Sequence, residues 1–509
     1  MLAKVLGCAV IGLEGVLVEV EVDVSNGFPA FTIIGVPDAV VNEARERIRS
    51  ALNNSSSVFL CKHVIVKLAP ANLCTEGLVY DLPIAIGVLL ASGQINPDVQ
   101  IGESLFLGEL SVDGRLHHTN GILSMVALAS EKQIKTVFVP AADALEAALI
   151  QDIAIYPIET LGQLIAHLNW ERRIEPFLPD PQVLNTNDHI SSEQDMTQIR
   201  GQEHVKRALE VAASGGHNIL LSRPPGPDIT LLARCMPSIL PPLVLEESLE
   251  VTKIYSASGM LPTDHPLILQ RPLRAPHHRI SQADFVGGGR IPRLGEMSLA
   301  HRGVLFLDEL PEWGQDVLQV LWQSLEDRMV TISREQGTLT YPAHFLVVAS
   351  MKQCPCGFFS DPVKACTCTA SAIARYHNRI SGPLLDKIDI HIEVPHIDYE
   401  KLAEKRKVET SHTIRKRVQA ARERQLQRFA GTKLTCNAQM GPSEVHDFCM
   451  VEPSAEQVFK AAMQQLHMSA GTFHQVLRLA RTIADQAESD VIAANHVAEA
   501  MWYRPRVGR

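Results

Sequence analysis

Two segments of the chain carry residues that could do chemistry together, but only one of them keeps the pattern that this chemistry needs. An acidic pair, Asp308 and Glu309, follows the apolar run GVLFL at 303–307. In nucleotide-hydrolysing proteins, such a pair at the end of a buried strand holds Mg²⁺ and orients the attacking water. The segment ILLSRPPGPDITLLA at 219–233 stands where the phosphate-binding loop of such a protein, GxxxxGK[ST], is expected. The acidic pair predicts ATP chemistry only if this loop binds phosphate.

The loop departs from the phosphate-binding pattern at most of its defining positions. Arg223 and Asp228 replace the two glycines, Ile229 replaces the lysine, and Thr230 alone keeps its type. Pro227 lacks a backbone N–H, Asp228 adds negative charge where phosphate would lie, and Ile229 removes the cation. Each lost charge-assisted hydrogen bond costs about 1.5–3 kcal/mol, so nucleotide affinity is expected to fall by orders of magnitude.

The segment is therefore predicted to be a degenerate phosphate loop with weak or lost binding of ATP and Mg²⁺. The positions concerned are Pro225, Gly226, Asp228, Ile229 and Thr230. Asp308 and Glu309 are either a remnant of the catalytic pair or structural acids that pair with basic neighbours. Arg223 is a cation at the start of the loop, and a replacement of the lysine by Arg223 is the less favoured interpretation.

Four cysteines form the second candidate site. Cys354 and Cys356 form a CPC pair, and nine residues separate it from a CTC pair formed by Cys366 and Cys368. Four thiolates around one centre suit a tetrahedral, structural Zn²⁺ ion, and reduced, packed cysteines are the alternative. The remaining cysteines are scattered, as is typical of a reducing compartment. Burial is expected for Cys61, Cys74, Cys235, Cys436 and Cys449.

The elements that must position these residues divide the chain into three parts. Residues 1–170 mix alternating strands (17–24, 62–69 and 136–139) with helical segments such as 38–54, which predicts an α+β domain. The proline-bearing segment 171–196 is interpreted as a linker. Residues 197–396 predict an α/β nucleotide-type core that opens with a helix closed by glycines 215–216 and a buried strand. Residues 397–509 predict a helical domain that contains helices over 413–429 and 474–486.

Composition sets broad limits on the function. The 509 residues carry a net charge of −10, and 46% are apolar. No apolar run is long enough to cross a bilayer, and the segment 82–93 is predicted to be a buried helix, so we expect a cytoplasmic protein without a membrane partner. Binding of DNA would require local basic patches. The candidates are Arg274, Arg279, Arg290, Arg293 and the helical residues Arg415, Lys416, Arg417, Arg422 and Arg424, although a charged helix is more often a solvated face.

Several long motifs resemble the magnesium-chelatase-like AAA+ family of the bacterial ComM/YifB type. They include FPAFTIIGVPDAVVNEARERIRSAL, DLPIAIGVLLASGQI, GQEHVKRALEVAASGGHN, RAPHHRIS, GEMSLAHRGVLFLDELPE, RYHNRISGPLLDKIDIHIEVP and ARTIAD, in an order that covers nearly the whole chain. The resemblance implies a multidomain α/β protein. Its parts would be an N-terminal Lon-protease-like domain of the ribosomal S5 domain 2 fold, an AAA+ core and a C-terminal helical domain of the magnesium-chelatase type.

The resemblance also implies a ring hexamer and an ATP-driven DNA helicase that promotes branch migration, but further positions depart from the family. The polar sensor asparagine is Lys352, the arginine-finger position is Lys387, and an arginine expected in the second sensor segment is Gly471. Lysine keeps the charge of arginine but not its planar fork. The place of a Lon-type catalytic serine is held by Ile84, so proteolysis is not expected.

Three functions remain open at the level of the sequence. The favoured one is a degenerate family member that acts in DNA processing, in a homo-hexamer or a mixed ring with an active paralogue, with little ATP turnover. The second is a working ATP-dependent helicase. The third is the ATPase subunit of a magnesium chelatase, which the N-terminal domain disfavours because that subunit resembles only the part after about residue 197.

Overall fold

A computed structural model describes residues 2–34, 38–55, 63–70, 77–96, 101–178, 194–224, 228–262, 264–289, 293–334, 337–359, 364–380, 382–385, 387–395, 408–466 and 469–504. The chain forms two compact units. The first comprises Met1–Asp188, Leu245–Ile268 and Gly289–Leu294, and the second comprises His189–Val244, Leu269–Gly288 and Gly295–Arg509. The three-domain division and its boundaries stay a prediction.

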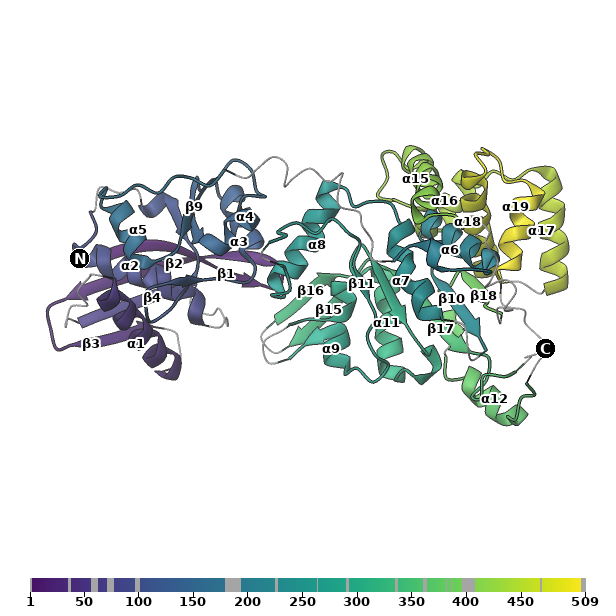
Figure 1. Cartoon of the computed structure of the whole chain (residues 1–509), viewed down its shortest axis with the longest axis horizontal. Coiled ribbons are helices and arrows are strands. Elements are labelled where there is room, and N and C mark those ends of the chain that lie inside the picture. Colours follow the sequence, from purple (N-terminus) through teal and green to yellow (C-terminus); the bar gives the residue numbers. More distant parts are fainter. Residues whose placement is uncertain are drawn as a thin grey trace. The chain divides into compact units, whose positions relative to one another are not determined.

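A mixed seven-stranded sheet forms the centre of the first unit, in the order β3-β4-β2-β1-β5-β8-β9 (Figure 1). Its strands are β1 (Leu2–Ile11), β2 (Glu14–Ser25), β3 (Ala30–Ile34), β4 (His63–Ala69), β5 (Ser104–Phe106), β8 (Thr136–Pro140) and β9 (Ala154–Ile158). β1 and β2 form an antiparallel hairpin, whereas β5, β8 and β9 are parallel. The short strands β6 (Glu109–Leu110) and β7 (Leu116–His117) pair separately.

The predicted strand at 17–24 is confirmed, together with the reason for its alternation. Val18, Val20 and Val22 are fully buried, whereas the acidic residues between them lie on the opposite face. Glu19 and Glu21 there form ion pairs with Lys4, at 2.6 and 3.0 Å. One face of the hairpin therefore packs in the core, and the other carries a charged ladder.

Helices cover both faces of this sheet. α1 (Asp38–Asn54), α2 (Asp81–Ala91) and α5 (Leu161–Leu168) contribute to one buried cluster, whereas α3 (Ile122–Glu131) and α4 (Ala144–Ala147) contribute to the other. The neighbouring residues Leu105 and Phe106 belong to different clusters, as expected for a strand that is buried on both faces. The predicted buried helix at 82–93 is confirmed as α2.

A helix from later in the chain, α8 (Leu245–Ala257), completes the first unit by packing on α3. The Glu146 carboxylate links the two helices, because it accepts from the Leu123 N–H at 2.8 Å and from the Ser256 hydroxyl at 2.5 Å. The Gly121 N–H also donates to the Ser256 carbonyl oxygen at 3.1 Å. The sequence pattern did not indicate this grouping.

The second unit contains a parallel five-stranded sheet in the order β11-β14-β17-β10-β18. The strands are β10 (Ile219–Arg223), β11 (Leu273–Arg274), β14 (Val304–Leu307), β17 (Leu346–Lys352) and β18 (Ile390–Glu393). Its helices are α6 (Glu203–Gly215), α7 (Ile229–Ile239), α9 (Gln282–Val286), α10 (Glu296–Leu299), α11 (Gln315–Asp327), α12 (Ala370–His377) and α13 (Gly382–Leu385). β15 (Met329–Arg334) and β16 (Gly337–Pro342) form a hairpin. Gly216, at φ 72°, ends α6 as the sequence predicts.

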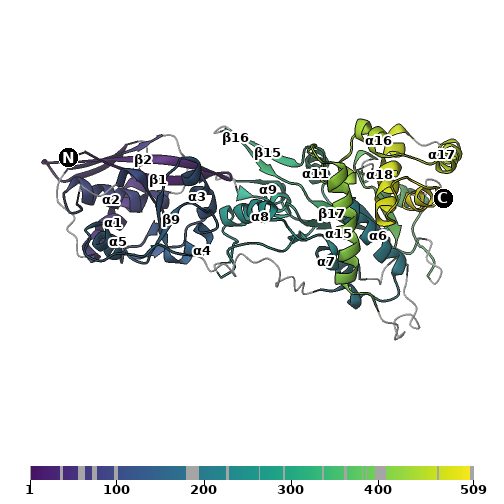
Figure 2. The same cartoon turned by 90° about the horizontal axis from the view of Figure 1, so that it is seen from above.

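The C-terminal part of the second unit is helical. It consists of α15 (Ser411–Arg428), α16 (Pro442–Phe448), α17 (Pro453–Leu466), α18 (Ala470–Gln486) and α19 (Ala494–Trp502). α15 runs along α6 and α7 (Figure 2), and all these elements share one buried core with the parallel sheet. The chain is thus a multidomain α/β protein with a parallel sheet and a helical C-terminal region. Within the described residues, every helix is too short or too polar to cross a bilayer.

Candidate nucleotide site and cysteine cluster

The parallel sheet brings the predicted site residues to one edge. Because parallel strands end at the same edge, the carboxyl ends of β10, β14 and β17 lie side by side. Arg223 ends β10 and is the register partner of Lys352, which ends β17. Asp308 and Glu309 follow β14 directly. Four of the residues singled out from the sequence therefore meet at the place where nucleotides bind in sheets of this kind.

Glu309 forms an ion pair with Lys352. The Lys352 ammonium donates to Oε1 of Glu309 and lowers the pKa of this carboxyl group below its ordinary value, with smaller contributions from the charges of His278 and Arg223. Glu309 also has a left-handed backbone, at φ 52°, which is uncommon for a residue with a side chain. Glu309, the residue predicted to orient water, is thus held by Lys352, the cation at the predicted sensor position.

Asp308 is tied to the protein by a residue that the sequence analysis did not single out. Oδ1 of Asp308 accepts from the Ser350 hydroxyl and, at 3.1 Å, from the Glu309 N–H. The Glu309 N–H also donates to Ser350 Oγ at 3.1 Å. Ser350 is buried in β17, in an apolar run that ends in a serine, and only the strand order places it beside β14.

The start of α7 carries its own anion. Asp228 is the N-cap residue, and its Oδ1 accepts from the Leu231 N–H at 3.0 Å. Free N–H groups at a helix start would bind a phosphate, so the Asp228 carboxylate occupies that role within the chain. Ile229 is 1% exposed and packs in the core of the unit. Pro225, Gly226 and Pro227 lie outside the described residues.

The two other positions that were predicted to depart from the family, Lys387 and Gly471, lie further along the chain than β17. Lys387 donates to Oε1 of Glu326 at 2.5 Å, so the cation at the predicted finger position is paired within the chain. Gly471 is the second residue of α18, and a Cβ there would meet only Ser469 Oγ, at 3.8 Å. A β-carbon would therefore fit at 471, and crowding at that atom does not explain the glycine.

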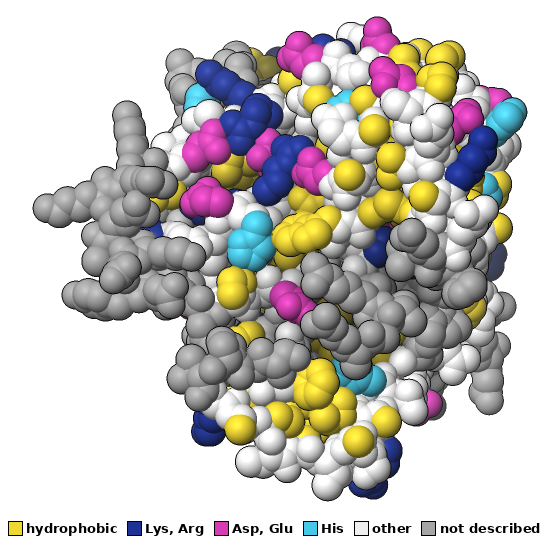
Figure 3. Space-filling model, turned by 90° about the vertical axis from the view of Figure 1, so that its right-hand side faces the viewer, with side chains coloured by type: hydrophobic (Ala, Val, Ile, Leu, Met, Phe, Trp, Pro, Cys, Tyr) yellow, Lys and Arg dark blue, Asp and Glu magenta, His cyan; other side chains and the backbone are white. Residues whose placement is uncertain are grey.

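Most of the predicted DNA-contacting cations are used inside the protein. Arg415 and Arg422 donate to the carbonyl oxygens of Ser238 and Ala213, and Arg417 pairs with Glu210 and Glu409. Arg424 pairs with Glu488 at 3.4 Å, and Arg274 forms a bidentate pair with Glu296 at 2.6 and 2.7 Å. Lys416, Arg279 and Arg293 are exposed, and Arg290 lies outside the described residues. On the face in Figure 3, basic side chains lie among acidic ones.

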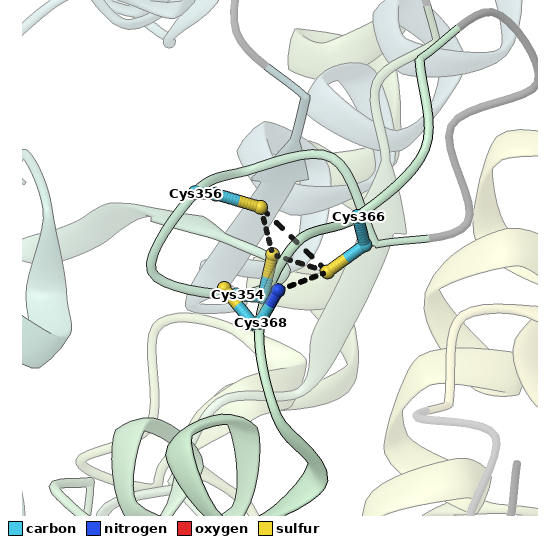
Figure 4. Close-up of side chains that lie close together, drawn as sticks. All are labelled: Cys354, Cys356, Cys366 and Cys368. Atoms are coloured by element: carbon cyan, nitrogen blue, oxygen red, sulfur yellow. Dashed lines mark hydrogen bonds between the residues drawn. The ribbon is translucent and has the colours of Figure 1, made fainter.

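The four clustered cysteines come together as the sequence predicts. Their sulfur atoms all lie within 4.8 Å of one another. Cys354 Sγ is 3.3 Å from Cys356 Sγ and 3.7 Å from Cys366 Sγ, and the remaining distance in this triangle is 3.6 Å (Figure 4). Backbone amides, that of Phe358 first, lower the pKa of Cys356 to about 5. The expected burial is confirmed for Cys235, Cys436 and Cys449, whereas Cys61 and Cys74 lie outside the described residues.

This multidomain α/β protein, with its parallel sheet and helical C-terminal region, matches three family models. Residues 195–402 match the model of magnesium chelatase, subunit ChlI. Residues 20–143 match subunit ChlI of Mg-chelatase, and residues 408–504 match the subunit ChlI C-terminal model. The chain belongs to this family, and the family suggests binding of nucleotide and Mg²⁺.

The relatives span almost the whole chain. Competence protein ComM of Haemophilus influenzae is 38% identical over 507 residues, which cover 99% of this chain and 98% of the relative. Uncharacterized protein YifB of Escherichia coli strain K12 is 38% identical and covers 97% and 96%. Uncharacterized protein Rv2897c of Mycobacterium tuberculosis is 35% identical and covers 99% and 98%. The predicted resemblance to the ComM/YifB type is therefore confirmed.

The described residues do not fit Mg²⁺-ATP well. A metal-bound polyphosphate needs amide donors at the helix start and a cation beside the phosphates. In this chain the Asp228 carboxylate caps the helix, and the next residue is the buried, uncharged Ile229. The Lys352 ammonium pairs with Glu309, the carboxylate that would orient the attacking water. Its positive charge would repel a metal ion held by the neighbouring Asp308.

Proposed function

We propose that this chain is a ComM/YifB-type AAA+ protein of DNA processing, related to recombination and transformation, that has lost most or all ATP hydrolysis. The observation that carries the proposal is the Lys352–Glu309 ion pair. A general base must accept a hydrogen bond from the attacking water, and a carboxylate that is paired with an ammonium is a weaker base.

The start of α7 supports the same proposal independently. The Asp228 carboxylate competes with phosphate for the amides of this helix start and also repels it. Removal of the Asp228 carboxylate alone would still leave the loop without a lysine, because position 229 is an isoleucine that packs in the core. Binding and hydrolysis are thus opposed by different residues, and a single reversion is not expected to restore turnover.

The finer architecture follows from the family resemblance. We propose a Lon-like domain of the S5 domain 2 fold at 1–170, a linker at 171–196, an AAA+ core at 197–396 and a helical lid domain at 397–509. The protein is proposed to act in the cytoplasm as a homo-hexamer or in a mixed ring with an active paralogue. In a mixed ring, the paralogue would supply the hydrolysis. DNA contact is proposed for the exposed cations Lys416, Arg279 and Arg293.

The name of one relative, competence protein ComM, supports a role in competence for this chain as well. The working helicase remains the second candidate, because Asp308 and Glu309 are both retained at the end of β14. The chelatase subunit is less favoured, because the relatives with full-length coverage include a competence protein.

The deciding experiment is a titration of the full chain with ATP and Mg²⁺, with phosphate release followed with and without single-stranded DNA. We expect no binding tighter than about 100 μM and no DNA-stimulated release. Tighter binding with release that Glu309→Gln abolishes would establish the helicase instead. Fluorescence anisotropy with a labelled single strand tests the DNA contact separately, and a lack of DNA binding in low salt would refute that part.

A further inference from the structure

We infer that Cys354, Cys356, Cys366 and Cys368 bind one structural Zn²⁺ ion. A tetrahedron with metal–sulfur bonds of 2.3 Å has sulfur–sulfur edges of about 3.8 Å. The distances of 3.3, 3.6 and 3.7 Å among three of the sulfurs are close to this edge, and all four lie within 4.8 Å of one another. Figure 4 shows the four side chains close together.

Packing alone does not explain the cluster. Cys354 is buried, but Cys356, Cys366 and Cys368 are only half-buried, whereas Cys8, Cys235, Cys436 and Cys449 are buried. A half-exposed thiol gains little from the hydrophobic effect, so burial gives no reason for three of them to meet. A disulfide is also excluded in this arrangement, because all four cysteines are free, and Cys354 Sγ and Cys356 Sγ are 3.3 Å apart, far above a bond length of about 2.05 Å.

The backbone around the cluster is arranged to stabilise thiolates. The Gly357 N–H donates to Cys354 Sγ at 3.2 Å, and the Cys368 N–H donates to Cys366 Sγ at 3.4 Å. Gly357 adopts φ 84°, a conformation that favours glycine, and the chain can therefore turn back over Cys354. Such donors around metal-bound sulfur orient the ligands and balance their charge.

Zinc fits this set of ligands better than the other common metals do. Mg²⁺ and Ca²⁺ take oxygen ligands, and no carboxylate belongs to the cluster among the described residues. An iron–sulfur cluster would occupy the space between its cysteines and hold their sulfurs further apart. Four protein thiolates leave no open position on the metal, so the centre is structural rather than catalytic.

The position of the centre assigns its role. Cys354 follows Lys352 by two residues, and Cys368 precedes the first residue of α12 by two. The metal therefore ties the end of β17 to the start of α12. A second tie is the contact of His377 Nε2 with the Gln353 carbonyl oxygen at 2.8 Å. The centre thus holds the strand end that presents Lys352 to Glu309.

The test is the metal content of the full chain, purified without chelators from zinc-containing medium and measured by inductively coupled plasma mass spectrometry. We expect about one zinc per chain. Cys366→Ser and Cys368→Ser should each lower the content at least tenfold, and Cys235→Ala, which removes a buried thiol elsewhere, should not. Far-UV circular dichroism checks that each variant is folded.

Titration of the metal-free chain with Co²⁺ tests the ligand set without reference to activity. Wild type and Cys235→Ala should show the intense sulfur-to-cobalt charge-transfer and d–d bands of a tetrathiolate site, and Cys368→Ser should lose them. A folded wild-type chain that neither contains zinc nor takes up Zn²⁺ or Co²⁺ would refute the inference. Full retention of zinc in Cys366→Ser and Cys368→Ser would do the same.

Discussion

Glu309 and Lys352 meet because β14 and β17 are neighbours in a parallel sheet and end at the same edge. Their side chains are 29% and 33% exposed, so the pair is only partly shielded from water. Asp228 caps α7, and the Ser350 hydroxyl donates to Asp308. Lys352 and Asp228, two of the predicted departures from an ordinary ATPase site, therefore each have a partner within the chain.

Loss of the Lys352 charge is expected to destabilise the fold in a pH-dependent manner. Lys352→Met keeps most of the side chain but leaves Glu309 without its cation, at a cost of about 1 kcal/mol near pH 7. The pKa of Glu309 is lowered in the folded state, so the pair stabilises above the unfolded pKa of Glu309 and this stabilisation is lost as pH falls through the folded pKa. Urea unfolding of the wild type and Lys352→Met between pH 7 and 3 should show that their difference in the free energy of unfolding shrinks as the pH falls. Lys460→Met, at an exposed pair with Glu456, is the control.

The cap of α7 predicts a second effect at a single residue. Asp228→Ala removes the acceptor for the Leu231 N–H and should lower the free energy of unfolding by about 0.5–2 kcal/mol. Asp228→Ser keeps an acceptor oxygen and should recover most of this loss. Urea unfolding at pH 7 measures both variants. Equal losses for the two would show that the carboxylate acts by something other than capping.

At the scale of elements, a buried polar network joins α15, α18 and His217, which lies between α6 and β10. Asp485 of α18 accepts from Arg428 of α15, from Asn437 Nδ2 at 2.8 Å and from Arg481 at 3.1 Å. Asn437 also donates to Thr482, whose hydroxyl lies 2.8 Å from the ring of the buried His217. Because burial makes an unpaired charge costly, this network holds the C-terminal helices to the α/β core in one arrangement.

Asp485→Asn should therefore be strongly destabilising. It leaves Arg481, which is 1% exposed, without its carboxylate, and the expected cost is about 3–5 kcal/mol. Glu488→Gln in the same region removes an acid that is 73% exposed in its pair with Arg424 and should cost less than about 1 kcal/mol. Unfolding midpoints in urea compare the two. Similar midpoints would mean that the network contributes little.

At the scale of the whole molecule, net charge and side-chain pairing limit DNA contact. The chain carries a net charge of −10, and Arg415, Arg417 and Arg422 are engaged within the fold. Binding to a single strand must then rest on a few exposed cations, such as Lys416 and Arg279. A small number of phosphate contacts makes binding weak at physiological salt.

Salt titrations of single-strand binding test this distribution of charge. Lys416→Ala should weaken binding and reduce the slope of log affinity against log salt by about 0.7, the value of one phosphate contact. Arg422→Ala is the control in the same helix. It should leave the slope unchanged, because Arg422 donates to the Ala213 carbonyl oxygen. It should lower stability instead. A larger loss of slope for Arg422→Ala than for Lys416→Ala would contradict the assignment.

The sequence by itself determined the family, the strands at 17–24 and 136–139, the helix at 38–54 and the four-cysteine cluster, because periodicity and motif spacing are local properties. Only the tertiary structure decided which charges meet. Lys352 lies 43 residues from Glu309, and the order of strands in the sheet, rather than any local pattern, brings the two together. The same reason explains Ser350 beside Asp308, the internal use of the α15 arginines and the packing of α8 on α3.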